Sequence, residues 1–304
     1  MNKVNNILIN LFHKLVYPNA NILKSIIKRN HVNIIGEGTK VIMFANGFGC
    51  DQSSWKFITD AFVKDYKLVL FDYVGSGKSD ISQYDFHKYS TLEGYACDVV
   101  DIIEALNLKD IIFIGHSVSS MIGMIAALQI PQVFDKLIFI GPSPKYLNDQ
   151  DYFGGFETEQ LESLLDFMAK DFISWTEFIA PLAMGNLARP ALSEFLQECF
   201  EAMDPQIALT FANATFRSDY RNELKNVTVP SLTVQSSEDA MAPISAGEYI
   251  KNNMPQNTLH VLNATGHYPQ ISEPAETIEA IKAYINNKSN AKQSKESDLE
   301  INNA

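Results

Sequence analysis

The feature that most constrains the fold of this chain is a regular alternation between short apolar runs and stretches with helical periodicity. The runs lack a polar residue at every second position, and they cover residues 41–45, 68–71, 111–114, 137–140 and 232–234. Such runs are typical of strands buried on both faces, as in a parallel sheet. Parallel neighbours need long crossover connections, and the helical stretches supply them. The alternation therefore predicts an α/β fold with a mostly parallel, doubly wound sheet.

Two of the crossover helices have clear sequence limits. Apolar periodicity predicts a helix over residues 91–106, with Ser90 and Glu93 forming a capping box at its start. A second helix is predicted over residues 118–130, because Pro131 cannot continue it.

The alternation lapses over residues 145–226, which contain no convincing strand. This block is predicted to form several amphipathic helices, interrupted at Pro181, Pro190 and Pro205. A helical block inserted between two strands is predicted to form a lid over the carboxyl ends of the strands.

The predicted lid is rich in aromatic residues, which together indicate a pocket with apolar walls. The aromatic residues proposed to line it are Phe153, Trp175, Phe178, Phe195 and Phe216. For any single one of them, ordinary packing between helices is the competing interpretation. The lid has an acidic balance overall, which argues against anionic substrates.

Composition excludes several classes of protein. The chain has 24 basic and 36 acidic residues, and the net charge of −12 has the wrong sign for nucleic-acid binding. Cys50, Cys97 and Cys199 have neither disulfide nor zinc spacing, which favours a reducing, cytoplasmic location. The sequence contains no run of 18 apolar residues, so no membrane span is predicted. No metal-ligand spacing is present, and no cofactor is implied.

The two ends differ from the rest of the chain. Residues 1–28 carry four lysines and no acid, with apolar residues at helical spacing, so they form a basic amphipathic extension. It would either contact a membrane surface or partner, or remain a peripheral extension. Residues 287–304 are polar and without periodicity, which predicts disorder. The core is then assigned to residues 29–144 and 227–286.

Ser117 is the candidate nucleophile. It lies in Ile111–Ser120, IIFIGHSVSS, directly after an expected strand and before an expected helix. This is the strand–turn–helix context of a nucleophile elbow, whose usual pattern is G-x-S-x-G. Ser119 replaces the last glycine, and a small serine is expected to fit there. The competing interpretation is a serine that only caps the helix.

A serine nucleophile needs a base, and the base needs an orienting acid. In this topology both follow the serine along the chain. Only His260 and His267 do so, and His267 is preferred because it lies in a loop after an expected strand that contains His260. Glu238 and Asp239 both follow the preceding strand, and the pattern does not choose between them.

Hydrolysis also needs donors for a developing oxyanion. One is expected from the backbone N–H of Val118, the residue after the nucleophile. The second is expected from Phe48, in the glycine-containing loop of residues 45–49 after an early strand. An ordinary turn between a strand and a helix is the competing interpretation of this loop.

Several stretches resemble RsbQ-type α/β-hydrolases, bacterial proteins that support energy-stress signalling, and their plant relatives, the strigolactone and karrikin receptors. The stretches include ANGFGCDQSSW, LFDYVGSGKSD, GHSVSSMIGM, VTVPSLTVQSSEDAMAP and ATGHYPQISEP. The similarity covers about residues 25–286, which is nearly the whole predicted domain.

The resemblance implies an α/β-hydrolase core with a four-helix lid and a small hydrophobic pocket. It implies Ser117, Asp239 and His267 as the catalytic triad, which decides the choice of acid, with Phe48 and Val118 at the oxyanion hole.

The implied function is hydrolysis of a small, neutral, apolar ester or lactone, of the esterase or lactonase type. A signalling role would bring a PAS-type phosphatase as a partner. The alternatives are a ligand receptor with slow hydrolysis and a carbon–carbon bond hydrolase.

Overall fold

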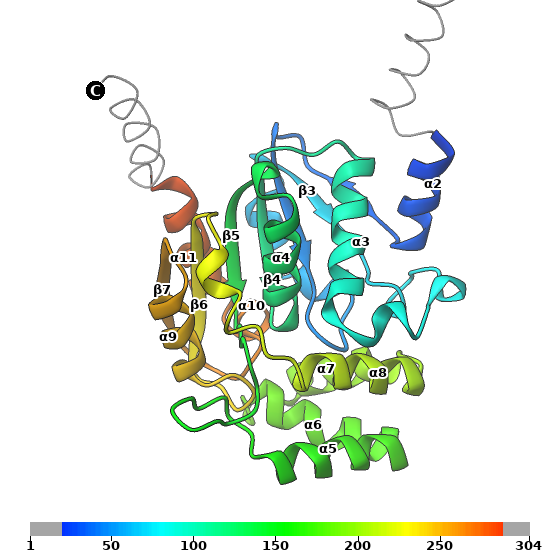
Figure 1. Ribbon diagram of the computed structural model, residues 1–304, viewed down its shortest axis with the longest axis vertical. Coiled ribbons are helices and arrows are strands. Elements are labelled where there is room, and N and C mark those ends of the chain that lie inside the picture. Colours follow the sequence, from blue (N-terminus) through cyan, green and yellow to red (C-terminus); the bar gives the residue numbers. More distant parts are fainter. Residues whose placement is uncertain (1–19, 288–304) are drawn as a thin grey trace, which may run out of the picture.

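The computed structural model describes residues 20–287 and contains one seven-stranded sheet (Figure 1). Its strands are β1 (Asn33–Ile35), β2 (Lys40–Ala45), β3 (Tyr66–Leu70), β4 (Ile111–His116), β5 (Phe134–Ile140), β6 (Ser231–Glu238) and β7 (Asn257–Thr265). The strand order is β1-β3-β2-β4-β5-β6-β7, in which only β1 pairs antiparallel. The prediction of a mostly parallel, doubly wound sheet is confirmed, and the five apolar runs fall on β2 to β6.

Helices cover both faces of this sheet. The helices of residues 20–287 are α2 (Ala20–Arg29), α3 (Leu92–Ala105), α4 (Val118–Gln129), α5 (Thr158–Lys170), α6 (Phe172–Met184), α7 (Pro190–Glu201), α8 (Pro205–Phe216), α9 (Ile244–Asn253), α10 (Pro269–Ser272) and α11 (Pro274–Asn286). One apolar layer joins the sheet to α3, α4 and α9, and continues into α5–α8. The other joins it to α11 and to the short turns at residues 52–61.

The start of α3 differs from the sequence expectation. The cap residue is Thr91, and Ser90 belongs to the preceding 3₁₀ turn, where its hydroxyl donates to the His87 carbonyl at 2.8 Å. Glu93 instead accepts a hydrogen bond from the Tyr220 hydroxyl at 3.0 Å. The Ser90–Glu93 capping box is therefore wrong, because the 3₁₀ turn moves the helix start one residue later.

Four helices, α5 to α8, come between β5 and β6 in the chain and gather at one end of the molecule (Figure 1). Pro190 and Pro205 begin α7 and α8, where a missing N–H removes no helical hydrogen bond. Pro181 lies inside α6, which it does not end. We call α5–α8 the lid helices; the limits proposed for the inserted segment, 145 and 226, stay a prediction.

Both chain ends fall mostly outside the described residues. The proposed extension is described only from residue 20, and the proposed disordered tail only at residue 287. The described part, α2, is attached to the core through Arg29, whose guanidinium lies 3.1 Å from the buried carboxylate of Asp98 on α3. Within residues 20–287, no helix is both long and apolar enough to cross a membrane.

Candidate active site

Ser117 lies at a sharp turn between β4 and α4. Its backbone has φ 54° and ψ −123°, a conformation that non-glycine residues rarely adopt. The turn is held by the Ser117 N–H, which donates to the Ile140 carbonyl of β5 at 2.7 Å. Because β4 lies between β2 and β5, this turn places the serine at the carboxyl end of a central strand.

The structure brings Ser117, His267 and Asp239 into one hydrogen-bonded chain. His267 Nε2 lies 2.7 Å from Ser117 Oγ, and His267 Nδ1 lies 2.8 Å from Asp239 Oδ2. A carboxylate only accepts hydrogen bonds, so Nδ1 carries the proton of the neutral imidazole and Nε2 accepts from the serine. The side chains of His267 and Asp239 are 5% and 0% exposed.

Backbone groups fix the acid and the imidazole in place. Asp239 Oδ1 accepts from the N–H groups of Met241 at 2.8 Å and Ala242 at 3.0 Å. The His267 N–H donates to the Ala183 carbonyl of α6 at 2.8 Å. Gly266 has φ +94°, and a Cβ there would lie 1.9 Å from the Met184 carbonyl oxygen. The loop that carries His267 is therefore packed tightly against a lid helix.

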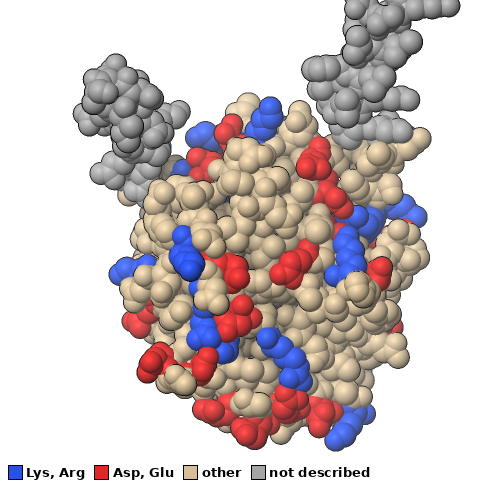
Figure 2. All heavy atoms as spheres, in the orientation of Figure 1, with Lys and Arg blue, Asp and Glu red and all other residues tan. Residues whose placement is uncertain are grey.

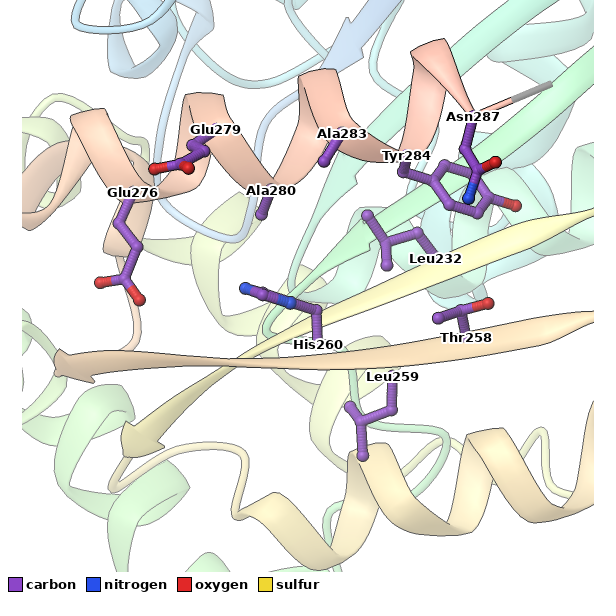
Figure 3. Close-up of a pocket in the computed structure, with 10 residues that line it drawn as sticks. All are labelled: Leu232, Thr258, Leu259, His260, Glu276, Glu279, Ala280, Ala283, Tyr284 and Asn287. Carbon is purple, nitrogen blue, oxygen red and sulfur yellow. The ribbon is translucent and has the colours of Figure 1, made fainter. Parts of the chain in front are cut away.

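The two alternatives for base and acid lie elsewhere. Glu238 is exposed and accepts from the Thr265 hydroxyl at 3.0 Å. His260 is exposed on β7 and faces a groove of about 430 Å³ between β7 and α11, together with Glu276 and Glu279 (Figure 3). Ser117 does not line this groove. It lines a separate and far smaller cavity of about 20 Å³.

The loop after β2 approaches the turn at Ser117 closely. A Cβ on Gly47 would lie 2.3 Å from the ring of His116, so this position accepts only glycine. Within residues 20–287, the backbone N–H groups of Phe48 and Val118 have no protein acceptor. Val118 directly follows Ser117, and Phe48 lines the same cavity as Ser117. Two free donors of this kind are what an oxyanion hole requires.

His116 connects this loop with the loop of His267. It is buried, and its Nε2–H donates to the His267 carbonyl at 2.7 Å. Burial, with a smaller effect of the neighbouring His267, lowers the pKa of His116 well below its usual range. The His116 imidazole is therefore neutral.

Ser119, at the position where the usual pattern has glycine, makes hydrogen bonds of its own. Its hydroxyl donates to the Asn46 carbonyl and lies 2.8 Å from the Tyr73 hydroxyl. Ser119 thus links the turn at Ser117 to the loop that carries Phe48. The departure from G-x-S-x-G is the sequence signal that could have indicated this link.

A cavity of about 20 Å³ lies above Ser117. Phe48 and His267 line it from the core, and Trp175, Ile179 and Phe216 line it from the lid helices. Its wall also holds the hydroxyl of Tyr146, 3.4 Å from Ser117 Oγ. This volume accommodates about one water molecule.

The expectation for the pocket aromatics needs correction. Trp175 and Phe216 line the cavity, whereas Phe153 and Phe178 are 57% and 54% exposed. Phe195 packs against Phe57 on the surface, with ring centroids 6.0 Å apart.

Helical phase explains the difference along α6. Trp175, Ile179 and Ala183 recur every four residues and line the cavity, so Phe178 points away from it. The lining residues that were not predicted are Ile179 and Ala183 on α6, and Tyr146, Phe200, Thr215, Met241 and Tyr268 elsewhere. The four-residue spacing on α6 was an available signal, whereas nothing local indicated the other positions.

Comparison with known proteins agrees with the fold. The model of the alpha/beta hydrolase fold family matches residues 40–274. The chain is 41% identical over 258 residues to the Karrikin insensitive 2 receptor CA of Petunia hybrida, covering 84% of this chain and 95% of the relative. It is 37% identical over 259 residues to the Strigolactone esterase D14 of Arabidopsis thaliana, covering 85% and 97%.

A solved structure of a hydrolase from Oleispira antarctica is 40% identical and superposes with a TM-score of 0.86. It covers 88% of this chain and 98% of its own. With a family match over most of its length and relatives of about 40% identity, the chain belongs to the α/β-hydrolase family.

Proposed function

We propose that this protein is a serine hydrolase that cleaves a small, neutral, apolar ester or lactone through an acyl-enzyme. The observation that carries the proposal is the unbroken hydrogen-bonded chain from Asp239 through His267 to Ser117, at the floor of an apolar cavity. Each member lies within hydrogen-bond distance of the next, which a nucleophile, its base and an orienting acid require.

The reaction follows from these contacts. Ser117 Oγ attacks the ester carbonyl carbon while His267 Nε2 takes the hydroxyl proton, and Asp239 stabilises the resulting imidazolium. The N–H groups of Phe48 and Val118 stabilise the negative oxygen of the tetrahedral intermediate. His267 returns its proton to the leaving alcohol, and the acyl group remains on Ser117. Water, deprotonated by His267, then releases the acid and restores the serine.

The walls of the cavity support the proposed substrate class. A charged group entering among Trp175, Ile179 and Phe216 would lose its hydration without gaining an ion-pair partner. Acidic side chains also gather at the lid end of the molecule (Figure 2), where Glu159 and Asp166 of α5 are exposed. Relatives named as a strigolactone esterase and a 3-oxoadipate enol-lactonase support esters and lactones as substrates.

Replacing the nucleophile tests the proposal directly. Ser117→Ala should abolish labelling by a fluorophosphonate probe and reduce hydrolysis of p-nitrophenyl acetate by roughly 10³-fold or more. The melting temperature should stay close to that of the wild type, because only a small hydroxyl is removed. Labelling of the alanine variant at the wild-type rate would show that another residue is the nucleophile.

A second candidate function is a ligand receptor or signalling component with slow hydrolysis. It is favoured by the relative named Karrikin insensitive 2 receptor CA. The RsbQ-type resemblance adds a PAS-type phosphatase in the cytoplasm as the partner to test. Slow turnover together with ligand-dependent capture of that phosphatase would favour this function. Fast turnover without capture would favour the esterase. Carbon–carbon bond hydrolysis by the same triad is the minor alternative.

A further inference from the structure

We infer that Thr215 is a specificity-determining residue: its hydroxyl binds a second oxygen atom of the substrate, apart from the ester group that reacts with Ser117. This inference rests on the proposed function. Thr215 is in the last turn of α8, is 1% exposed, and lines the cavity together with Ser117. Within residues 20–287, the side-chain oxygen of Thr215 has no hydrogen-bond partner.

A buried threonine in a helix normally donates its hydroxyl to a carbonyl one turn earlier. Two other threonines of the lid helices do so. Thr210 donates to the Gln206 carbonyl at 2.9 Å, and Thr176 donates to the Ile173 carbonyl at 2.7 Å. Thr215 makes no such bond, although the carbonyl of Phe211 lies one turn before it in the same helix.

A buried hydroxyl without a partner is unfavourable, so native structures rarely retain one without a reason. The cavity is the space that Thr215 lines, and a guest in that cavity can supply the missing hydrogen bond. Trp175 lines the same cavity, and its buried indole N–H also has no partner among residues 20–287. An indole N–H only donates, so the complementary guest group is an acceptor.

The predicted substrate therefore carries two oxygen functions. Its ester or lactone carbonyl lies at Ser117, and an ether or carbonyl oxygen lies at Thr215. The remaining contacts on the lid side, from Ile179, Ala183 and Phe216, are with carbon. A substrate with a methylene group in place of the second oxygen fills the same space but leaves the hydroxyl without a partner.

The test compares p-nitrophenyl methoxyacetate with p-nitrophenyl butyrate, whose acyl groups differ by an ether oxygen in place of a methylene. The ratio of kcat/KM for the two esters is measured for the wild type and for Thr215→Val, so that the difference in intrinsic reactivity cancels. We expect the ratio to fall about tenfold in the variant, the size expected for one neutral hydrogen bond. The loss should fall on the methoxyacetate.

Thr176→Val is the matched control. It removes a buried lid hydroxyl that already donates to the Ile173 carbonyl and does not line the cavity, so its ratio should equal that of the wild type. If Thr215→Val does not fold, Thr215→Ser and Thr215→Ala make the same comparison. The serine variant should keep the wild-type ratio, and the alanine variant should lose it.

The proposed function and the role of Thr215 are overturned by different results. An unchanged ratio in Thr215→Val, with both esters still hydrolysed, overturns the role of Thr215 and leaves the hydrolase intact. A wild-type protein that hydrolyses neither ester overturns the proposed function and the Thr215 inference together.

Discussion

The carboxyl ends of the strands, here called the sheet edge, carry Ser117, Asp239 and His267. The sheet edge and the lid helices surround the same cavity but are built differently. At the sheet edge, His267 and Asp239 are each held by at least two hydrogen bonds to fixed partners. On the lid side, Trp175, Ile179 and Phe216 make apolar contacts, and two polar atoms lack partners within the described chain. Under the proposed function, the sheet edge would determine the reaction, whereas the lid would determine which molecule undergoes it.

The two sides therefore respond differently to substitution. A change at the sheet edge alters transition-state stabilisation for every substrate, because it disturbs groups aligned for one reaction. A change in the lid alters the relative rates of different substrates.

The largest effect is expected at the orienting acid. Asp239→Asn should lower kcat by about 10⁴-fold, because an amide at this position favours the wrong tautomer of His267. Since this effect acts on the chemical step, it should be the same for every ester tested. It is measured by steady-state kinetics with p-nitrophenyl acetate and butyrate.

Glu238→Gln is the matched control for that substitution. Glu238 is adjacent in sequence, but it is exposed and bonded to Thr265, so the variant should retain nearly full activity. A severe defect in Glu238→Gln together with a mild one in Asp239→Asn would show that Glu238, and not Asp239, is the orienting acid.

An intermediate effect is expected from the lid. The small, apolar cavity should accept acetyl and butyryl esters of p-nitrophenol once the lid helices open to admit them. A decanoyl ester meets side chains that cannot all move aside, and a succinate monoester would bury a charge. We expect kcat/KM for both to fall at least about 10²-fold below butyrate. Decanoate or succinate as the best substrate would contradict an enclosed cavity and indicate an open cleft.

The smallest effect is expected in the stability of the sheet edge at acid pH. His116 is neutral when buried, whereas the unfolded chain takes up a proton near pH 6.5. The contribution of His116 is therefore fully present above about pH 6.5 and is lost as the pH falls below that value. The loss is about 1.4 kcal/mol of unfolding free energy per pH unit until the lowered pKa is reached.

The non-titrating variant His116→Gln can retain the N–H that reaches the His267 carbonyl, and it should flatten this pH dependence. Urea denaturation at several pH values between about 5 and 7 measures the slope. The exposed His260→Gln variant controls for the loss of an imidazole. Equal slopes in His116→Gln and the wild type would remove His116 as a source of acid instability.

The strands and the residues at their ends could be predicted from the sequence because their signals are local. Ser117 and His267 each follow an expected strand, so their positions at the carboxyl edge required only the parallel sheet. The pattern could not choose between Glu238 and Asp239, because the register of β6 and β7 shifts between Ser236 and Glu238. That irregularity breaks the alternation that otherwise tells which way a side chain points.

The lid was less predictable because its inward face is set by contacts between helices. The aromatic content of the segment indicated an apolar wall, yet Phe178 and Trp175 are only three residues apart and point in different directions. Which face of α6 meets the core depends on its packing against α7 and on the loop of His267. The Thr215 hydroxyl was missed for the same reason, since nothing local separates it from the other polar residues of α8.

The small volume of the cavity has a consequence for affinity. A space for about one water molecule cannot admit an ester, so a ligand must bind a more open form of the lid. The apparent dissociation constant then equals the intrinsic one divided by the fraction of molecules that are open. Substitutions on the outer faces of α5–α8, which never touch the ligand, would change that fraction. Such distant positions could therefore tune the ligand concentration to which the protein responds.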